Sequence, residues 1–330
     1  MNRLKRKPVD KIPNLNILMT FAGRYIDVSY DKYCQDYRYL VEGNIKCSEA
    51  FGIDMVCTVS DPYREAHDFG MELEFPYDNL PICRKHLLNG PGDLKKVKLF
   101  NPHETRRMQD RIKAVELFKK EIGGYYPITG WVEGPIAEAS DLRGIYEFMI
   151  DLYEEPEFVE ELMNICCEEA IICAREQVKA GCDFIGIGDS AASLVSPKTY
   201  SELVVPMEKR IVDEIHKLGA KAKLHICGNI SNLLDYVCDT GADIVDIDWM
   251  VDFKTAVKKT GGRCCINGNI DPVRVVYEGT PDMVRAEIEK LTGVIDANSC
   301  ISAGCEVPKF TPYENLKAFD DALRHISKSL

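Results

Sequence analysis

The chain has 330 residues, of which 45% are hydrophobic and 28% charged, and its net charge at neutral pH is −12. Such an acidic chain lacks the basic surface that nucleic-acid binding needs, so we exclude that class of partner. The chain has no apolar run of about 18 residues and no apolar signal-peptide core at its start, so we expect neither a membrane span nor secretion. The 14 cysteines are spread through apolar stretches, which indicates reduced thiols in the cytoplasm.

Short apolar runs of strand length alternate along the chain with longer amphipathic stretches. Over residues 157–180, Val159, Leu162, Met163 and Cys166 recur at helical spacing. The predicted strands cover residues 14–20, 54–60, 126–132, 183–188, 221–226, 243–248, 263–267 and 299–303. Eight strand–helix alternations predict a (β/α)8 TIM barrel that forms a single domain over residues 1–330. A doubly wound sheet is the alternative, but no glycine-rich dinucleotide-binding motif follows the first strand.

Polar residues follow most of the predicted strands. Barrel enzymes carry their active sites at the carboxyl ends of the strands, so we expect a site there. The stretch 61–98 follows the second strand and is rich in proline, glycine and charge, so we expect a loop over the barrel mouth. The residues that follow a predicted strand or end one are Asp61, Glu133, Asp189, Cys227, Asp248, Asn269, Asp271 and Cys305.

A set of metal-binding residue types stands out among them. His225 and Cys227 lie in LHICGN, and Cys305 lies in ISAGCEVP. Residues two apart on a strand face the same side, so His225 and Cys227 can reach one metal ion. One imidazole and two thiolates suit Zn²⁺, and three protein ligands leave the fourth tetrahedral position open, as in catalytic zinc sites. The alternative interpretation is a buried histidine and cysteine that only pack in the core.

The fourth zinc ligand is not evident from the sequence. Asp189, Glu133, Asp248 and Glu306 are candidates by their positions at strand ends, and water or a substrate thiol is an equal alternative. Adjacent strand residues face opposite sides, so the pair Cys264–Cys265 is predicted to pack in the core rather than to chelate a metal.

Several motifs carry a resemblance to a known family. They are AGRY (22–25), SDP (60–62), FGME (69–72), DIDW (246–249), INGNIDP (266–272) and TPYENLKAF (311–319). Together they show that the whole chain resembles the uroporphyrinogen decarboxylase superfamily. Within it, LHICGN and SAGCEVP are similar to the zinc-dependent branch of methylcobamide:coenzyme M-type methyltransferases, which implies that His225, Cys227 and Cys305 are the zinc ligands.

The chain departs from the decarboxylase pattern at two places. Thr20 stands where the decarboxylases have an arginine, and Cys305 stands where they have a histidine. Arg24 and Asp61 match, so the resemblance implies that they are candidate catalytic residues. Arg24 would hold an anionic group of a small substrate, or form a structural salt bridge instead. Asp61 corresponds to the aspartate that binds pyrrole N–H groups, and is retained here either for function or only as superfamily architecture.

The resemblance implies a corrinoid-dependent methyltransferase in the cytoplasm. A methyl group would move between methylcobamide, carried by a partner corrinoid-binding protein, and a small-molecule acceptor or donor, with a thiol activated by zinc. The direction of transfer and the substrate stay open. One alternative is a metal-free decarboxylase that relies on Arg24 and Asp61, and another is a non-catalytic binding module with a closed, four-ligand metal site.

Overall fold

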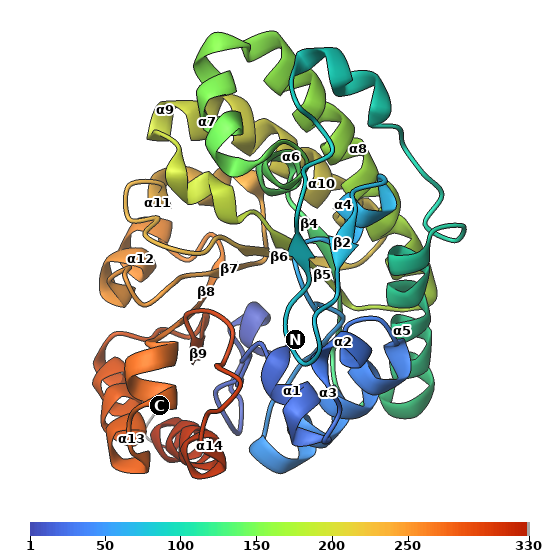
Figure 1. Ribbon diagram of the computed structural model, residues 1–330. Coiled ribbons are helices and arrows are strands. Elements are labelled where there is room, and N and C mark those ends of the chain that lie inside the picture. The colour runs from blue at the N-terminus through green and yellow to red at the C-terminus, as the bar shows by residue number, and fades with distance from the viewer. Residues whose placement is uncertain (329–330) are drawn as a thin grey trace.

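The computed structural model describes residues 1–328, and its central feature is a curled sheet of parallel strands (Figure 1). Within these residues the sheet has seven strands, and each pairs in parallel with the next strand of the sheet in chain order. The predicted (β/α)8 barrel is therefore confirmed. The strands of the sheet are β1 (Val56–Cys57), β4 (Ile128–Glu133), β5 (Phe184–Gly188), β6 (Lys221–His225), β7 (Ile244–Asp246), β8 (Cys265–Ile270) and β9 (Ser299–Ala303), and a separate hairpin comprises β2 (Leu73–Glu74) and β3 (Ile82–Cys83).

An extended segment at Asn14 occupies the position of the eighth strand, but it makes few backbone hydrogen bonds to its neighbours. Asn14 forms an isolated parallel bridge with Ile301 of β9, and its carbonyl accepts a hydrogen bond from the Asp54 N–H (2.9 Å) on the other side. Farther along, the Asn16 side chain, rather than a backbone carbonyl, accepts a hydrogen bond from the Ala303 N–H (2.6 Å). The first predicted strand is therefore wrong in its extent, because side-chain bonds replace the backbone ladder. The segment still closes the barrel between β9 and β1.

Helices surround the sheet and connect most of its strands (Figure 1). The helix predicted over residues 157–180 is confirmed as α8 (Pro156–Ala180), which ends at Gly181 in the left-handed conformation that glycine tolerates. Helix α14 (Tyr313–Ser327) packs against α3 (Tyr37–Phe51), so the first part of the chain meets the last. No helix within residues 1–328 combines the length and apolar composition that a membrane crossing requires. The other α-helices are α1 (Thr20–Tyr25), α2 (Tyr30–Tyr33), α4 (Arg64–Asp68), α5 (Arg106–Ile122), α6 (Pro135–Arg143), α7 (Ile145–Glu154), α9 (Pro197–Thr199), α10 (Val205–Lys217), α11 (Leu234–Val237), α12 (Phe253–Thr260) and α13 (Pro281–Lys290).

Side chains along the strands alternate between the helix-facing core and the barrel interior. On β5, Ile185 and Ile187 belong to the main apolar core, while Gly186 and Gly188 face inward. A Cβ atom at Gly186 would lie 2.2 Å from the Trp131 ring, so only glycine leaves room for the indole beside this strand. Toward the amino ends of the strands, a separate apolar cluster contains Leu15, Phe184, Ile244, Cys265 and Cys300.

The stretch 61–98, predicted as a loop over the barrel mouth, has short elements of its own. It contains helix α4 and the antiparallel hairpin of β2 and β3, so it has more regular structure than the predicted loop. Its first residues, Asp61 and Pro62, line a cavity at the mouth. An ion pair between Lys309 Nζ and Asp78 (2.8 Å) joins the stretch to the chain that follows β9. The segment therefore packs beside the carboxyl ends of the strands.

Candidate metal centre

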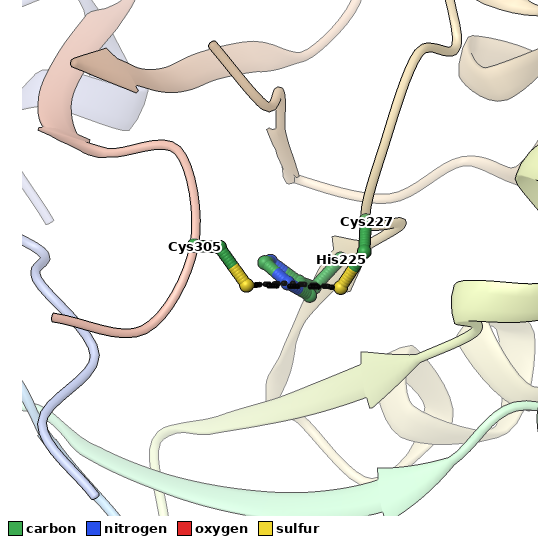
Figure 2. Close-up of side chains that lie close together, drawn as sticks. All are labelled: His225, Cys227 and Cys305. Carbon is green, nitrogen blue, oxygen red and sulfur yellow. Dashed lines mark hydrogen bonds between the residues drawn. The ribbon is translucent and has the colours of Figure 1, made fainter. Parts of the chain in front are cut away.

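Three side chains from distant parts of the chain meet at the carboxyl ends of the barrel strands (Figure 2). His225 ends β6, Cys227 follows it by two positions, and Cys305 lies on the loop after β9. Nε2 of His225 lies 3.3 Å from the Cys227 sulfur and 3.9 Å from the Cys305 sulfur, and the two sulfurs are 3.8 Å apart. The structure thus brings together the three residues that the sequence singled out as zinc ligands.

The local backbone explains how one short segment presents both an imidazole and a thiol. His225 and Cys227 face the barrel mouth, while Ile226 between them is buried in the apolar core. Gly228 then turns the chain with a φ of +87°, a conformation that glycine adopts without strain. Its N–H donates a hydrogen bond to Asp248 (2.8 Å), so this carboxylate holds the turn that follows Cys227.

The orientation of His225 is set by Asp246 on the neighbouring strand β7. Nδ1 of His225 donates a hydrogen bond to Asp246 Oδ2 (2.9 Å), which leaves Nε2 free to face the two sulfurs. Lys223 forms an ion pair with the same carboxylate, and Asn267 Nδ2 donates to its other oxygen (2.8 Å). Burial raises the pKa of Asp246, but Lys223 and His225 lower it by more, so the net pKa falls to about 2. Asp246 is therefore ionised at neutral pH and fixes the imidazole.

The spacing of the three ligand atoms fits a zinc ion. Tetrahedral geometry with Zn–S distances of about 2.3 Å and a Zn–N distance of about 2.0 Å separates two sulfurs by about 3.8 Å and a nitrogen from a sulfur by about 3.5 Å. The two sulfurs lie 3.8 Å apart, and the nitrogen–sulfur distances of 3.3 and 3.9 Å lie on either side of the expected value. The donor set and its spacing are thus both suited to zinc.

The two thiols differ in acidity because they share a hydrogen bond. The hydrogen bond from Cys227 lowers the pKa of Cys305, and His225 lowers it too, so that it falls to about 4 although burial raises it. The same hydrogen bond and burial raise the pKa of Cys227. Cys305 is therefore the more acidic of the two predicted sulfur ligands.

A cavity of about 230 Å³ opens beside the three predicted ligands. A second cavity, of about 380 Å³, shares Ser190 and Cys227 with it, so further open space adjoins the predicted ligands. Trp131 and Glu133 reach the first cavity from β4, because Gly188 on β5 leaves them space: a Cβ atom there would lie 3.0 Å from each side chain. The first cavity is lined by Ile17, Met19, Val59, Asp61, Pro62, Trp131, Glu133, Gly188, Ser190, His225, Cys227, Cys305 and Glu306.

None of the four carboxyl candidates joins the three ligand atoms, which form the one such metal-ligand group in residues 1–328. Asp189 is buried and accepts a hydrogen bond from the first turn of α6, and Asp248 holds the Gly228 turn. Glu306 accepts hydrogen bonds from the N–H (2.7 Å) and hydroxyl (2.6 Å) of Thr20. Glu133 lines the cavity but binds Arg64 (2.6 Å). These contacts favour water or a substrate atom as the fourth ligand.

Sequence and structure comparisons identify the family. The uroporphyrinogen decarboxylase (URO-D) profile matches residues 1–326. The chain belongs to the uroporphyrinogen decarboxylase family. The methylcobamide:CoM methyltransferase MtbA of Methanosarcina mazei is 30% identical over 322 residues, covering 95% of this chain and 93% of the relative. The uroporphyrinogen decarboxylase of Carboxydothermus hydrogenoformans is 23% identical over 328 residues, covering 94% and 91%.

A solved structure shows the same fold. A methyltransferase from Methanosarcina mazei has a TM-score of 0.89 and 23% identity, covering 98% of this chain and 96% of that one. The uroporphyrinogen decarboxylase family thus includes relatives named for methyl transfer and relatives named for decarboxylation. Family membership alone does not decide between methyl transfer and decarboxylation, so the residues of the site must be considered.

Asp61, one of the two candidate catalytic residues carried over from the uroporphyrinogen decarboxylase family, lines the cavity but is already bonded. Its carboxylate accepts hydrogen bonds from Arg107 Nη2 (2.6 Å) and Ser60 Oγ (2.7 Å), and it is 1% exposed. Burial raises the pKa of Asp61, but Arg107 and then Arg64 lower it by more, so the net shift is downward. Asp61 is therefore an ionised, ion-paired carboxylate, and a catalytic role for it stays a prediction.

Arg24, the other candidate, does not line the cavity. Its Nη1 donates hydrogen bonds to the carbonyls of Lys309 (3.1 Å) and Thr311 (3.4 Å). Its guanidinium also lies over the rings of Phe310 and Tyr313, at 5.3 and 5.2 Å from their centroids. These contacts hold the loop that follows Cys305, and binding of a substrate anion by Arg24 stays a prediction.

Sequence reasoning missed the charged groups beneath the site. Lys223 was assigned no role, although a lysine two residues before His225 on the same strand face is a readable signal. Arg64 and Arg107 are buried on helices and pair with acids at the cavity wall. Nothing in their local pattern marks them, because arginines on amphipathic helices are usually exposed. Only the folded chain shows that they neutralise buried carboxylates.

Cys264 and Cys265 face opposite sides of the barrel wall, as the sequence predicted. The Cys264 sulfur lies 3.3 Å from that of Cys238, whereas the Cys265 sulfur lies 3.7 Å from that of Cys300 in the inner apolar cluster. Neither belongs to the metal-ligand group. Their place in the packed interior agrees with the predicted packing role.

Proposed function

We propose that this chain is a zinc-dependent methyltransferase that moves a methyl group between methylcobamide, carried by a separate corrinoid-binding protein, and the sulfur of a small substrate. The observation that carries the proposal is the His225–Cys227–Cys305 set, whose spacing fits zinc and which faces a small cavity. Relatives named methylcobamide:CoM methyltransferase support this choice within the family. We place the reaction in the cytoplasm, where thiols stay reduced.

Zinc held by these three residues would lower the pKa of a thiol bound at the open position and keep it ionised at neutral pH. The protein's own groups prepare this chemistry. Asp246 holds His225 with Nε2 toward the site, and the thiolates of Cys227 and Cys305 balance the charge of a divalent ion. A substrate sulfur in this neutral surrounding keeps its electron density and stays nucleophilic.

In the direction of thiol methylation, a lone pair of the substrate sulfur forms the new S–C bond. The C–Co bond of methylcobamide breaks, and its electron pair stays on cobalt. Demethylation of a methylated substrate onto reduced corrinoid uses the same protein groups. The apolar side of the cavity, which includes Ile17, Met19 and Val59, keeps bulk water away from the reacting sulfur.

The cavity itself argues against uroporphyrinogen as the substrate. A porphyrinogen that bears many carboxylates needs several cations to hold it. Within residues 1–328, the cavity wall contains three carboxyl side chains and no lysine or arginine. We therefore treat decarboxylation of uroporphyrinogen as the competing activity, and the following test is designed to detect it.

The test combines metal analysis with a transfer assay. Protein purified anaerobically from zinc-supplied cells is analysed for metal by mass spectrometry, and is then mixed with methylcobalamin and a small thiol. We expect about one zinc per chain and zinc-dependent loss of the methylcobalamin absorption, with the methylated thiol as product. A protein without zinc that decarboxylates uroporphyrinogen would overturn the proposal, and so would a zinc protein that transfers no methyl group in either direction.

A further inference from the structure

The cavity beside the predicted zinc ligands is acidic and apolar. Its wall contains the carboxyl groups of Asp61, Glu133 and Glu306, and no lysine or arginine of residues 1–328 lines it. The one basic side chain in the lining is His225, whose Nε2 faces the two sulfurs of the predicted zinc site. Trp131 and several aliphatic side chains form most of the remaining wall. A sulfonate or carboxylate entering this space would lose its hydration without gaining a cation in return.

Two buried guanidinium groups lie behind this wall, and each contacts a carboxyl group of the protein. Arg107 Nη2 lies 2.6 Å from Asp61 Oδ2. Arg64 Nη2 lies 2.6 Å from Glu133 Oε1 and 3.6 Å from Glu65 Oε2, so two carboxyl groups share one guanidinium. Both arginines are at most 1% exposed, and turning either toward a ligand would break a buried ion pair. Both guanidinium groups are therefore held by contacts within the protein and are not free to bind a ligand.

The other cations near the site are also occupied. Lys223, beneath His225, forms an ion pair with Asp246. Arg24 donates to backbone carbonyls of the loop after Cys305, and Lys309 on that loop pairs with Asp78 (2.8 Å). The metal centre adds no positive charge, since two thiolates balance a divalent ion. An anionic substrate thus finds no partner for its charge in this part of the chain.

We propose that the site takes small thiols that are uncharged or carry a cationic group, and that it discriminates against thiols that carry an anionic group. The proposal rests on the proposed function, because it concerns the thiol at the fourth zinc position. A cationic group would lie near the ionised carboxylate of Asp61 and the Trp131 ring, both of which attract cations. It differs from the expectation that Arg24 holds a substrate anion, because the donors of Arg24 already bind backbone.

A matched series of thiols separates charge from size. Cysteamine, 2-mercaptoethanol and 2-mercaptoethanesulfonate share the same spacer and end in an ammonium, a hydroxyl and a sulfonate. Each is titrated into the full chain loaded with Co²⁺, where thiolate binding changes the metal's absorption, and into the zinc form by calorimetry. We expect Kd values for cysteamine and 2-mercaptoethanol at least about tenfold lower than the Kd for the sulfonate.

A cation placed in the wall should reverse this preference. Met19 lines the cavity at the start of α1 and is half-buried, so a longer polar side chain can be accommodated there. Met19→Lys is expected to improve the sulfonate's affinity, relative to that of 2-mercaptoethanol, by about tenfold, and to weaken cysteamine binding. Met19→Gln has similar length and no charge, so it measures the effect of a polar side chain alone, and it should change the sulfonate ratio much less than Met19→Lys does.

The outcomes distinguish this inference from the proposed function. Tighter binding of the sulfonate than of both other thiols to the wild-type chain would overturn the inference and leave methyl transfer intact. An unchanged sulfonate ratio in folded Met19→Lys would overturn the account of cavity charge. If no thiol altered the absorption of the cobalt form, the proposed function itself would fail, and the inference with it.

Discussion

The two ends of the barrel each hold a pair of cysteines at nearly the same separation. At the mouth, the sulfurs of Cys227 and Cys305 lie 3.8 Å apart, and near the amino ends of the strands those of Cys265 and Cys300 lie 3.7 Å apart. The mouth pair has His225 within 3.3 and 3.9 Å and borders a cavity. The other pair packs with Leu15, Phe184 and Ile244 and is at most 2% exposed.

This difference shows that proximity of two thiols does not make a metal site. The mouth pair has a third donor, a carboxylate that orients that donor, and open space for a fourth ligand. The inner pair lacks an imidazole among its described neighbours, and its apolar surroundings raise the cost of a charged thiolate. The same residue type is therefore predicted to bind a metal at one end of the barrel and packs in the apolar interior at the other.

The largest expected effect comes from removing one sulfur from each pair. Cys305→Ser should reduce the metal content from about one zinc to nearly none and slow methyl transfer by more than about 100-fold, because an alcohol is a poor zinc ligand. Cys300→Ser is the matched control at the inner end and should retain its zinc. Metal analysis and the methylcobalamin assay measure both. Equal metal loss in the two variants would show that the mouth pair has no special role.

The second-largest effect is expected at Asp246, the carboxylate that orients His225 beside the mouth pair. Asp246→Asn keeps the shape of the side chain but removes the charge that orients His225 and pairs with Lys223. We expect zinc affinity to fall by about 10- to 100-fold, as measured by competition with a chelator. Asp243→Asn is the control, because Asp243 just before β7 is half-buried and pairs with Lys221 and His216 rather than with a predicted zinc ligand. Unchanged affinity in Asp246→Asn would argue against orientation of the imidazole by this contact.

The mouth should also respond to pH through Glu133. Burial raises the pKa of Glu133, and despite the opposing effect of Arg64 the value is about 8, compared with an ordinary 4.5. At pH values between 4.5 and about 8, Glu133 therefore keeps its proton in the folded chain and loses it in the unfolded chain. The free energy of unfolding should therefore fall as pH rises from 4.5 to about 8, by up to about 1.4 kcal/mol per pH unit.

Glu133→Gln removes this contribution, so its stability should fall less steeply over the same range. Urea unfolding of both zinc-loaded proteins at several pH values measures the two slopes. Glu133 also raises the pKa of Asp141 and Glu138 by charge repulsion, so the difference between the two slopes reports Glu133 together with its effect on these neighbours. Parallel curves would show that this carboxyl group has no raised pKa in the folded chain.

The smallest effect is expected at the inner pair. Cys265→Ala removes one buried sulfur from an apolar cluster and leaves a small void, which should lower the free energy of unfolding by about 1 kcal/mol. Zinc content and transfer rate should match those of the wild-type chain. Urea unfolding and metal analysis decide the matter, and a loss of zinc would mean that the two ends of the barrel are coupled.

Most of the barrel was predictable because its signals are local. Strand-length apolar runs alternate with helical patterns, and β4 to β9 each lie within or close to a predicted range. The segment at Asn14 was not predictable in detail. Its hydrogen bonds come from the side chains of Asn16 and Asp54, which replace the backbone ladder and depend on partners far along the chain.

The sequence by itself predicted the ligand set that we propose for the site. His225 and Cys227 share a strand face because their spacing matches the period of a strand, and Cys305 was found from its motif and its place after the last strand. Only the tertiary structure decided the separations of these atoms, the partner of His225 and the charge of the cavity. Those properties depend on side chains such as Asp246, Arg64 and Arg107, which come from different strands and helices and acquire their meaning only when the barrel closes.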